Sequence, residues 1–328
     1  MLAVARAGAD AGTLGPGSHL IEIRYGGLGR SYIVNVPPQG SSASALPAIL
    51  NFHGAGSNAW QEERYSAMNT AAARYGFIAV YPNGTGPRPR TLTWNAGGCC
   101  YWAVSNKIDD VGFTRALLDD LAARTRLDRS RVYATGISNG GMMAYRLGVE
   151  APDRIAAIAP IEGALMVEVS ALRRPMPLIV FNSLDDPWVP YGGSSRLYAW
   201  FAHLAAAYPA VDETIARWRA FDGCPAKART GPVLKGAAGT TDAGNSATRY
   251  AWGPCAGGTE VALWKLTGSG HVWPGAARDY PLVIGQGTWV IDANEEMWKF
   301  FRDFSLPSDK GASIEPRNPV PEPSLVSH

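Results

Sequence analysis

The chain has 328 residues, of which 46% are hydrophobic and 18% charged, a composition that fits a globular protein with one large α/β domain or two small ones. Its 30 basic and 28 acidic side chains leave a net charge of +2 with no basic stripe, which excludes a strong general affinity for nucleic acid. No apolar run reaches the length of a transmembrane helix, so no membrane partner is expected.

The first predicted elements are an antiparallel hairpin and then alternating strands and helices. Residues 19–25 and 30–36 alternate apolar and polar positions on either side of a glycine-rich turn, which predicts two paired strands. The apolar runs 47–52 and 77–82 predict buried strands, and the pattern at 61–75 predicts a helix between them.

Residues 84–108 are rich in Gly, Pro, Trp and Asn and are expected to be irregular. A helix is predicted from residue 109 to about 126, with Asp109 and Asp110 as caps at its N-terminus. The later elements are predicted strands at 131–135, 156–160, 178–181 and 261–266 and predicted helices at 194–207 and 292–304. This alternation predicts an α/β fold with a mostly parallel central sheet and helices on both faces, preceded by the antiparallel hairpin.

The chain is divided into three parts by composition. Residues 1–17 are expected to be an N-terminal extension, 18–305 a single α/β domain, and 306–328 a Pro/Ser-rich tail or linker without periodicity. The first part is Ala/Gly-rich but lacks a continuous apolar stretch, so no signal peptide is visible.

The most informative motif is Gly136-Ile137-Ser138-Asn139-Gly140. It follows a predicted buried strand and precedes a predicted helix, and this strand–GxSxG–helix arrangement is typical of a nucleophile elbow. A serine on such a sharp turn needs neighbours without Cβ atoms, so that strand and helix can approach closely. Ser138 is therefore the predicted nucleophile.

A serine nucleophile needs an adjacent base, and the base needs an orienting acid. Of the five histidines, only His271 lies in a glycine-bracketed loop directly after the last core strand, as the chain order Ser, acid, His requires. Asp186, just past a buried strand, is the predicted acid, because Pro187 gives its predecessor one defined direction. Asp185 is the close competitor, and Glu162 is a further candidate.

Two backbone amides are predicted to form an oxyanion hole. One is the N–H of Asn139, the residue after the nucleophile. The second should come from the turn His53-Gly54-Ala55-Gly56, which follows a buried strand. Ala55 is the predicted donor there, with Gly56 as the next choice.

Four cysteines are present, and they allow three pairings. Cys99 and Cys100 are adjacent and would either bridge or stay reduced. Cys224 and Cys255 flank a Gly/Ala/Thr-rich stretch that resembles a stapled loop. Four buried free thiols are the alternative. No Cys/His spacing indicates zinc, so no metal site is expected.

Aromatic side chains are numerous, with 11 tryptophans and 13 tyrosines, and several fall in loops near the predicted catalytic positions. Flat aromatic walls suit a planar acyl group, although each ring could equally pack in the core. The predicted substrate-binding residues are Trp94, Trp188, Tyr191 and Trp273.

Seven segments together resemble the secreted esterases grouped as polyhydroxybutyrate depolymerase-like and feruloyl esterase-like proteins, the first carbohydrate esterase family. The resemblance covers residues 18–305. Its segments are HGAG at 53–56, WNAGGCC at 94–100, DDVGF at 109–113, GISNGGMM at 136–143, DDPWVPY at 185–191, FDGCP at 221–225 and GSGHVWPG at 268–275.

This resemblance implies an α/β-hydrolase fold, ester hydrolysis without a cofactor, and a catalytic triad of Ser138, Asp186 and His271. It also implies a disulfide between Cys224 and Cys255. One departure is Asn182-Ser183-Leu184, where many relatives have His-Gly-Thr. Because such relatives are exported, the resemblance implies an extracellular or periplasmic protein, whose start would be that of a mature or truncated form.

Three hypotheses for function follow. The first is a serine carboxylesterase of feruloyl esterase type that acts on plant cell-wall hydroxycinnamate esters. The second is a depolymerase of polyhydroxybutyrate or another polyester. The third, from a different class, is a non-catalytic relative that binds a glycan or polymer, which an incomplete triad would favour.

Overall fold

The computed structural model of the chain describes residues 3–5, 13–41, 44–194, 207–276 and 284–307. These residues form an 11-stranded sheet in the order β1-β2-β3-β5-β4-β8-β9-β10-β13-β12-β11, and a separate hairpin of β6 and β7. The sheet consists of β1 (Ala3–Ala5), β2 (Gly17–Tyr25), β3 (Leu28–Val36), β4 (Leu46–Phe52), β5 (Ile78–Pro82), β8 (Leu127–Ile137), β9 (Ala157–Ile161), β10 (Leu178–Ser183), β11 (Arg229–Lys235), β12 (Ser246–Trp252) and β13 (Val261–Thr267).

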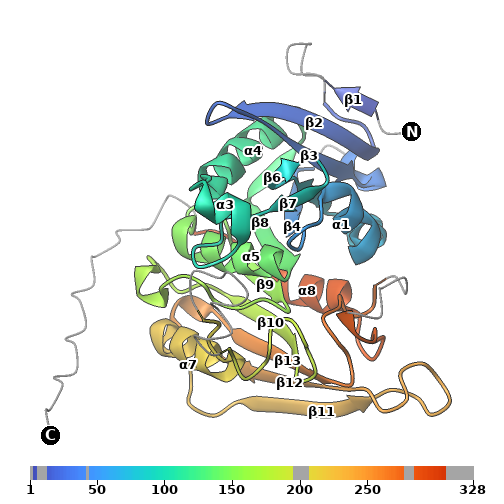
Figure 1. Cartoon of the computed structure of the whole chain (residues 1–328), viewed down its shortest axis with the longest axis vertical. Helices are drawn as coiled ribbons and strands as arrows, with labels where there is room; N and C mark the ends of the chain where they lie inside the picture. Colours follow the sequence, from blue (N-terminus) through green and yellow to red (C-terminus); the bar gives the residue numbers. More distant parts are fainter. Residues whose placement is uncertain (1–2, 6–12, 42–43, 195–206, 277–283, 308–328) are drawn as a thin grey trace, which may run out of the picture.

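The helices connect these strands and lie on both sides of the sheet (Figure 1). They are α1 (Ala59–Ser66), α2 (Met68–Tyr75), α3 (Tyr101–Ser105), α4 (Asp110–Arg124), α5 (Asn139–Glu150), α7 (Val211–Asp222) and α8 (Ala293–Phe301). Short 3₁₀ turns occur at η1 (Pro38–Ser41), η2 (Val169–Ala171) and η3 (Ala256–Gly258). The small hairpin consists of β6 (Thr85–Arg88) and β7 (Thr91–Thr93).

The centre of the sheet is parallel and its flanks are antiparallel, except that the edge strand β1 pairs in parallel with β2. Strands β5, β4, β8, β9, β10 and β13 run in parallel. The hairpin β2–β3 joins one side through an antiparallel pair with β5, and β12 and β11 extend the other side antiparallel to β13. The predicted parallel sheet with an N-terminal hairpin is confirmed.

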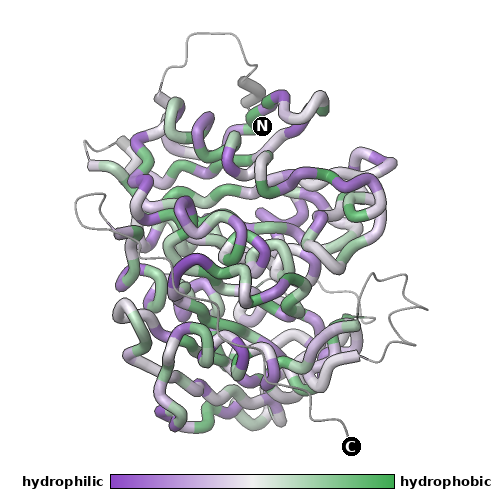
Figure 2. Tube along the Cα trace, turned by 90° about the vertical axis from the view of Figure 1, so that its left-hand side faces the viewer, coloured by the Kyte–Doolittle hydropathy of each residue, from purple (hydrophilic) through white to green (hydrophobic). Residues whose placement is uncertain are grey.

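Each face of the sheet buries its own apolar core. One core contains side chains of α4, α5 and α7, such as Phe113, Met142 and Trp218. The other contains side chains of α1, α2 and α8, such as Met68 and Met297. Strands buried on both faces read as continuous apolar runs, which is why the central strands were recognisable in the sequence. Figure 2 shows long hydrophobic stretches running through the interior of the trace.

Several predicted elements need correction. The helix predicted at 61–75 is two helices, because Ala67 adopts a left-handed φ of 52° that ends α1 before α2 begins. The region 84–108 is not wholly irregular, since it contains the β6–β7 hairpin and α3. Strands β11 and β12 and helix α7 were not predicted. The helix predicted at 194–207 falls almost wholly outside the described residues.

The two aspartates at the start of α4 have different roles. Asp109 is the N-cap, because its side chain accepts the N–H of Gly112 at 2.8 Å. The prediction that Asp110 is also a cap is wrong. Its buried carboxylate accepts from Arg30 Nη2 at 2.7 Å and from the Asn95 N–H at 2.8 Å. Burial raises the pKa of Asp110 and lowers that of Arg30, and their ion pair opposes both shifts.

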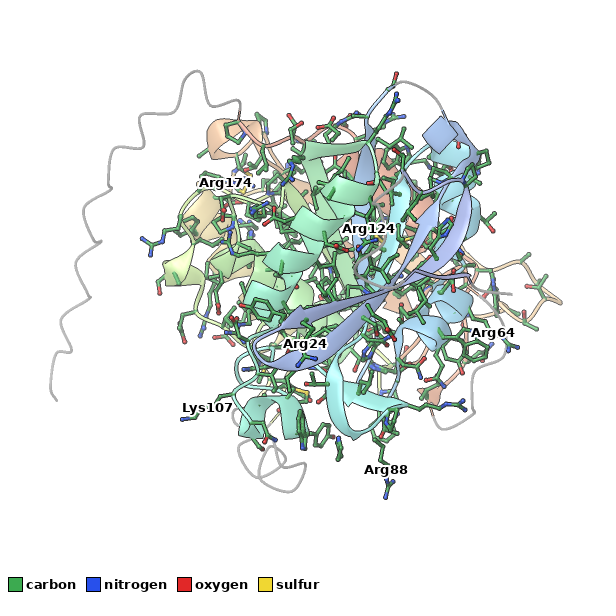
Figure 3. All side chains as sticks on the ribbon, turned by 90° about the horizontal axis from the view of Figure 1, so that it is seen from above. Arg24, Arg64, Arg88, Lys107, Arg124 and Arg174 are labelled. Carbon is green, nitrogen blue, oxygen red and sulfur yellow. A yellow bond between two sulfur atoms is a disulfide. The ribbon has the colours of Figure 1, made fainter. Side chains whose placement is uncertain are left out.

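The basic side chains Arg24, Arg64, Arg88 and Lys107 are dispersed over the molecule in Figure 3, where Arg88 and Lys107 project outward at its lower edge. Within the described ranges, no helix combines the length and the apolar character that a membrane crossing requires.

Candidate active site

The candidate site lies at the carboxyl ends of β8, β10 and β13, which is where loops build the sites of parallel α/β sheets. Ser138 follows β8 directly, Asp186 lies in the loop after β10, and His271 in the loop after β13. Backbone bonds hold these loop starts together, with Ser138 N donating to Ile161 O and Leu184 N to Leu266 O, both at 2.9 Å. Strand order therefore brings the three predicted catalytic residues to one edge.

Ser138 occupies a sharp turn between β8 and α5. Its φ of 59° and ψ of −124° are unfavourable for a residue with a side chain, and such strain is held only where the surroundings enforce it. A Cβ on Gly136 or on Gly140 would overlap the carbonyl oxygen of Phe52, and one on Gly141 would lie 2.9 Å from Ile161 O. The glycines of the motif thus allow β4 and α5 to pack against the turn.

Asp186 and His271 are joined by a hydrogen bond of 2.7 Å between Oδ2 and Nδ1. The other carboxylate oxygen of Asp186 accepts the N–H groups of Trp188 at 2.7 Å and of Val189 at 2.9 Å. Burial by itself raises the pKa of Asp186, but the hydrogen bonds outweigh burial and hold that pKa below its ordinary value. The carboxylate is therefore ionised, and it fixes the imidazole with Nδ1–H pointing toward it.

The two other candidate acids, Asp185 and Glu162, have different partners. Asp185 is exposed, and its Oδ2 accepts the N–H of Gly268 at 2.7 Å, which ties this loop to the one that carries His271. Glu162 follows β9, and its buried carboxyl is hydrogen-bonded to Asp186. Asp186 is thus the candidate that the fold brings to His271. No hydrogen bond joins Ser138 Oγ to His271 within the described part of the chain.

The predicted oxyanion donors are partly corrected by the structure. Gly56 is excluded, because its N–H donates to Leu92 O at 2.9 Å. The N–H groups of Ala55 and Asn139 donate to no other group in the ranges that the structure describes. The turn lies beside the serine, since a Cβ on Gly54 would be 3.5 Å from Ser138 Cβ. Asn139 also begins α5, whose N-terminus carries a partial positive charge.

His53 positions this turn, a role that the sequence analysis did not assign. Its Nδ1–H donates to Gly54 O at 2.8 Å, and its Nε2 accepts the N–H of Gly84 at 3.0 Å. Complete burial lowers the pKa of His53 to about 4, so the ring is neutral near pH 7. The HGAG motif could have indicated this role in the sequence, because its histidine directly precedes the turn that carries the proposed oxyanion donor.

Most of the predicted aromatic wall is core rather than surface. Trp94, Tyr191 and Trp273 are 0%, 7% and 2% exposed, and their polar ring atoms donate to protein acceptors. Trp94 has no exposed face for a substrate, whereas the substrate contacts predicted for Tyr191 and Trp273 stay predictions. Trp188 is 47% exposed in the loop that carries Asp186 and stays a predicted substrate contact.

All four cysteines are paired. Cys224 and Cys255 form a disulfide with an S–S distance of 2.04 Å, which joins the end of α7 to the turn before β13. Cys99 and Cys100, whose state the sequence left open, are joined to each other.

The mostly parallel sheet, its helices on both faces and the strained serine turn define an α/β-hydrolase fold. A family model described as esterase PHB depolymerase matches residues 30–194. The chain belongs to this family, in agreement with the resemblance in the sequence.

Curated relatives are esterases. The "Putative esterase NocK" of Nocardia uniformis subsp. tsuyamanensis is 30% identical over 275 residues, covering 80% of this chain and 76% of the relative. Feruloyl esterase B of Piromyces equi is 28% identical over 284 residues, covering 85% of this chain and 46% of the relative. The bifunctional acetylxylan esterase/xylanase XynS20E of Neocallimastix patriciarum is 26% identical, covering 90% of this chain and 37% of the relative. The chain thus spans less than half the length of the last two relatives.

Among solved structures, an acetyl xylan esterase from Aspergillus awamori has a TM-score of 0.54 at 14% identity, covering 86% of this chain and 98% of that one. This similarity supports the fold. The family and the esterase relatives show that the chain is a carboxylic ester hydrolase.

Proposed function

We propose that this ester hydrolase works through an acyl-enzyme formed on Ser138, with His271 as general base and acid and Asp186 as its orienting partner. The observation that carries the proposal is the 2.7 Å bond between Asp186 Oδ2 and His271 Nδ1, at the same sheet edge as the strained serine turn. A serine, a base and an orienting acid are the parts that nucleophilic acyl transfer needs.

In the first half of the reaction, His271 takes the proton of the Ser138 hydroxyl as its oxygen attacks the ester carbonyl. Asp186 accepts from Nδ1 and stabilises the imidazolium that forms. The N–H groups of Ala55 and Asn139 then donate to the oxyanion of the tetrahedral intermediate. His271 returns its proton to the leaving alcohol, and the acyl group stays on Ser138.

In the second half, water repeats the attack on the acyl-enzyme. His271 removes a proton from water, the same two amides stabilise the second oxyanion, and Ser138 leaves with the proton from His271. The carboxylic acid product is released and the serine is restored.

The deciding experiment is the Ser138→Ala variant, assayed with a short p-nitrophenyl ester. We expect turnover to fall at least about 10³-fold while folding is retained, because the oxyanion donors alone sustain only residual catalysis. Incubation of the wild type with a slow ester or a phosphonate should add one acyl or phosphonyl mass to the peptide containing Ser138. Near-full activity of the alanine variant would overturn the assignment.

For the substrate class, we propose hydroxycinnamate esters of the feruloyl type. The curated relative named feruloyl esterase B, at 28% identity, supports this class. The half-exposed Trp188 beside the proposed acid offers one aromatic face on which a planar acyl group would stack. The supporting aromatic surface is smaller than the sequence predicted, so the acyl contact should depend strongly on this one residue.

A panel of methyl ferulate, a short p-nitrophenyl ester and a polyhydroxybutyrate film tests the substrate class. Preference for methyl ferulate, reduced in Trp188→Ala through a raised KM, supports the proposal. Preference for the film supports the polyester alternative, which the family name favours. Binding to polymer without turnover of any ester would indicate the non-catalytic alternative.

We also propose that the protein is exported. The protein has two disulfides. Disulfides persist in oxidising compartments and are uncommon in a reducing cytosol. Fractionation of the source cells, with antibody detection in periplasm or medium, would test this location.

A further inference from the structure

Glu162 is a second buried carboxyl beside the proposed acid. It follows β9, the strand between β8, which leads to Ser138, and β10, which leads to Asp186. The residue is 0% exposed and has a left-handed φ of 43°, which is costly for a glutamate. Backbone strain of this kind clusters at functional sites.

The hydrogen bonds of Asp186 leave one place for Glu162. An ionised carboxylate offers about four acceptor sites on its two oxygens. Trp188 and Val189 fill two of them through their N–H groups, and His271 fills a third through Nδ1. The side chain of Glu162 is hydrogen-bonded to the same carboxylate and supplies the fourth partner.

The bond between the two acids needs one proton. Two adjacent carboxylates without solvent cannot both be ionised, so one must be a neutral acid that donates its O–H to the other. Burial first, and then the charge of Asp186, raises the pKa of Glu162 well above its ordinary value, whereas the pKa of Asp186 is lowered. Glu162 therefore carries the proton and Asp186 the negative charge.

The remaining contacts of Glu162 lower its pKa, but burial and the charge of Asp186 outweigh them. Its two oxygens lie 3.0 Å and 3.1 Å from the N–H of Ser183, and its Oε2 lies 3.4 Å from Asn182 Nδ2. Both donors are uncharged. Within the described residues, Asp186 is the charged group acting on Glu162, and His271 is the titratable group beyond it.

We propose that Glu162 is a positioning residue, whose protonated carboxyl donates a hydrogen bond to Asp186 and thereby fixes the direction and the basicity of the acid that orients His271. This inference rests on the proposed triad. The donated bond draws negative charge from Asp186. When that bond is removed, the Asp186–His271 pair should hold its proton more tightly. In a plot of kcat/KM against pH, the acid limb, where activity falls because His271 is protonated, should then move to higher pH.

Three variants separate this role from simple packing. Glu162→Leu removes the donor, and we expect its acid limb to rise by about one pH unit, with a lower kcat and little change in KM. Glu162→Gln keeps an N–H donor of similar shape, and its acid limb should stay close to that of the wild type. Glu62→Gln makes the same change at another buried glutamate, 2% exposed in α1, and should leave the profile unchanged.

A measurement independent of activity covers the case in which Glu162→Leu fails to fold. The infrared difference spectrum of wild type minus Glu162→Gln at neutral pH should show the carbonyl stretch of a protonated carboxylic acid. This band reports the proton on Glu162 whether or not Ser138 is the nucleophile, so it distinguishes a failure here from a failure of the proposed triad.

Three results would overturn the inference. The first is the absence of the protonated-acid band in the difference spectrum. The second is a Glu162→Leu enzyme with reduced kcat/KM but an unmoved acid limb, which would show a structural role only. The third is a Glu162→Gln enzyme whose acid limb moves as far as that of Glu162→Leu, because then the donor is not what matters.

Discussion

Asn139 holds both backbone polar groups of Trp94: its Oδ1 accepts the Trp94 N–H at 2.7 Å, and its Nδ2 donates to the Trp94 carbonyl at 3.1 Å. Both residues are fully buried. Because Asn139 directly follows Ser138, this pair ties the serine turn to the segment that contains Cys99 and Cys100. The indole N–H of Trp94 donates to His53 O at 3.0 Å, which links the same segment to the turn carrying Ala55.

Replacing Asn139 with alanine should therefore damage both stability and catalysis. The change leaves the N–H of Trp94 buried without a partner, at a cost of about 1–3 kcal/mol, while the Trp94 carbonyl keeps the N–H of Cys100 at 3.1 Å. The serine turn and the proposed oxyanion amides also lose a support, so kcat should fall more than KM rises. Urea denaturation and ester kinetics measure the two effects. Unchanged values for both would show that the pair has no energetic weight.

Replacing Gly140 with alanine should destabilise the fold through backbone overlap. The added Cβ would overlap the Phe52 carbonyl, and neither backbone can rotate away as a side chain would. We expect a loss of about 3 kcal/mol or more in the free energy of unfolding. Gly29→Ala is the matched control, because a Cβ there meets no atom within 4 Å. The free energy of unfolding of Gly29→Ala should stay within about 0.5 kcal/mol of the wild type. Equal losses of stability in both variants would contradict the steric argument.

His53 should make folding stability depend on pH. Burial lowers its pKa from 6.5 to about 4, so between these values the unfolded chain binds the proton more readily than the folded one. The contribution of His53 to stability is therefore full above pH 6.5 and is lost as the pH falls toward 4, by roughly 3 kcal/mol in total.

The His53→Gln variant isolates this contribution, because glutamine does not titrate. Glu62, with a pKa raised by burial to about 8, acts with the opposite sign but is common to both proteins. The difference in unfolding free energy between wild type and variant should thus shrink on acidification from pH 6.5 to 4. Parallel stability curves across this range would refute a buried neutral His53.

The disulfide between Cys224 and Cys255 should stabilise the protein without supporting catalysis. It closes a loop of sequence separation 31, and the chain-entropy estimate for its removal is roughly 4 kcal/mol. It lies near the start of β13, whereas the proposed site is at the other end of that strand. The double variant Cys224→Ser/Cys255→Ser should therefore melt at lower temperature yet keep kcat/KM at 25 °C. A large loss of kcat/KM in the folded variant would contradict this separation.

The sequence by itself determined the parallel centre of the sheet, because strands buried on both faces must be continuous apolar runs, as at β4, β5 and β10. It also determined the serine turn, since only glycine at 136 and 140 allows the Phe52 backbone to pass so closely. These features depend on local sterics and on periodicity, which neighbouring residues express directly.

Tertiary structure alone decided which side chains meet. Asp185 and Asp186 are adjacent in sequence, yet one binds the Gly268 N–H and the other His271, because successive side chains leave the loop in different directions. Trp94 was predicted to lie in an accessible loop, but it is buried, because the end of the sheet and His53 enclose it. Glu162 touches Asp186 because β9 lies between β8 and β10, and contacts made across strands depend on sheet order, which no local pattern encodes.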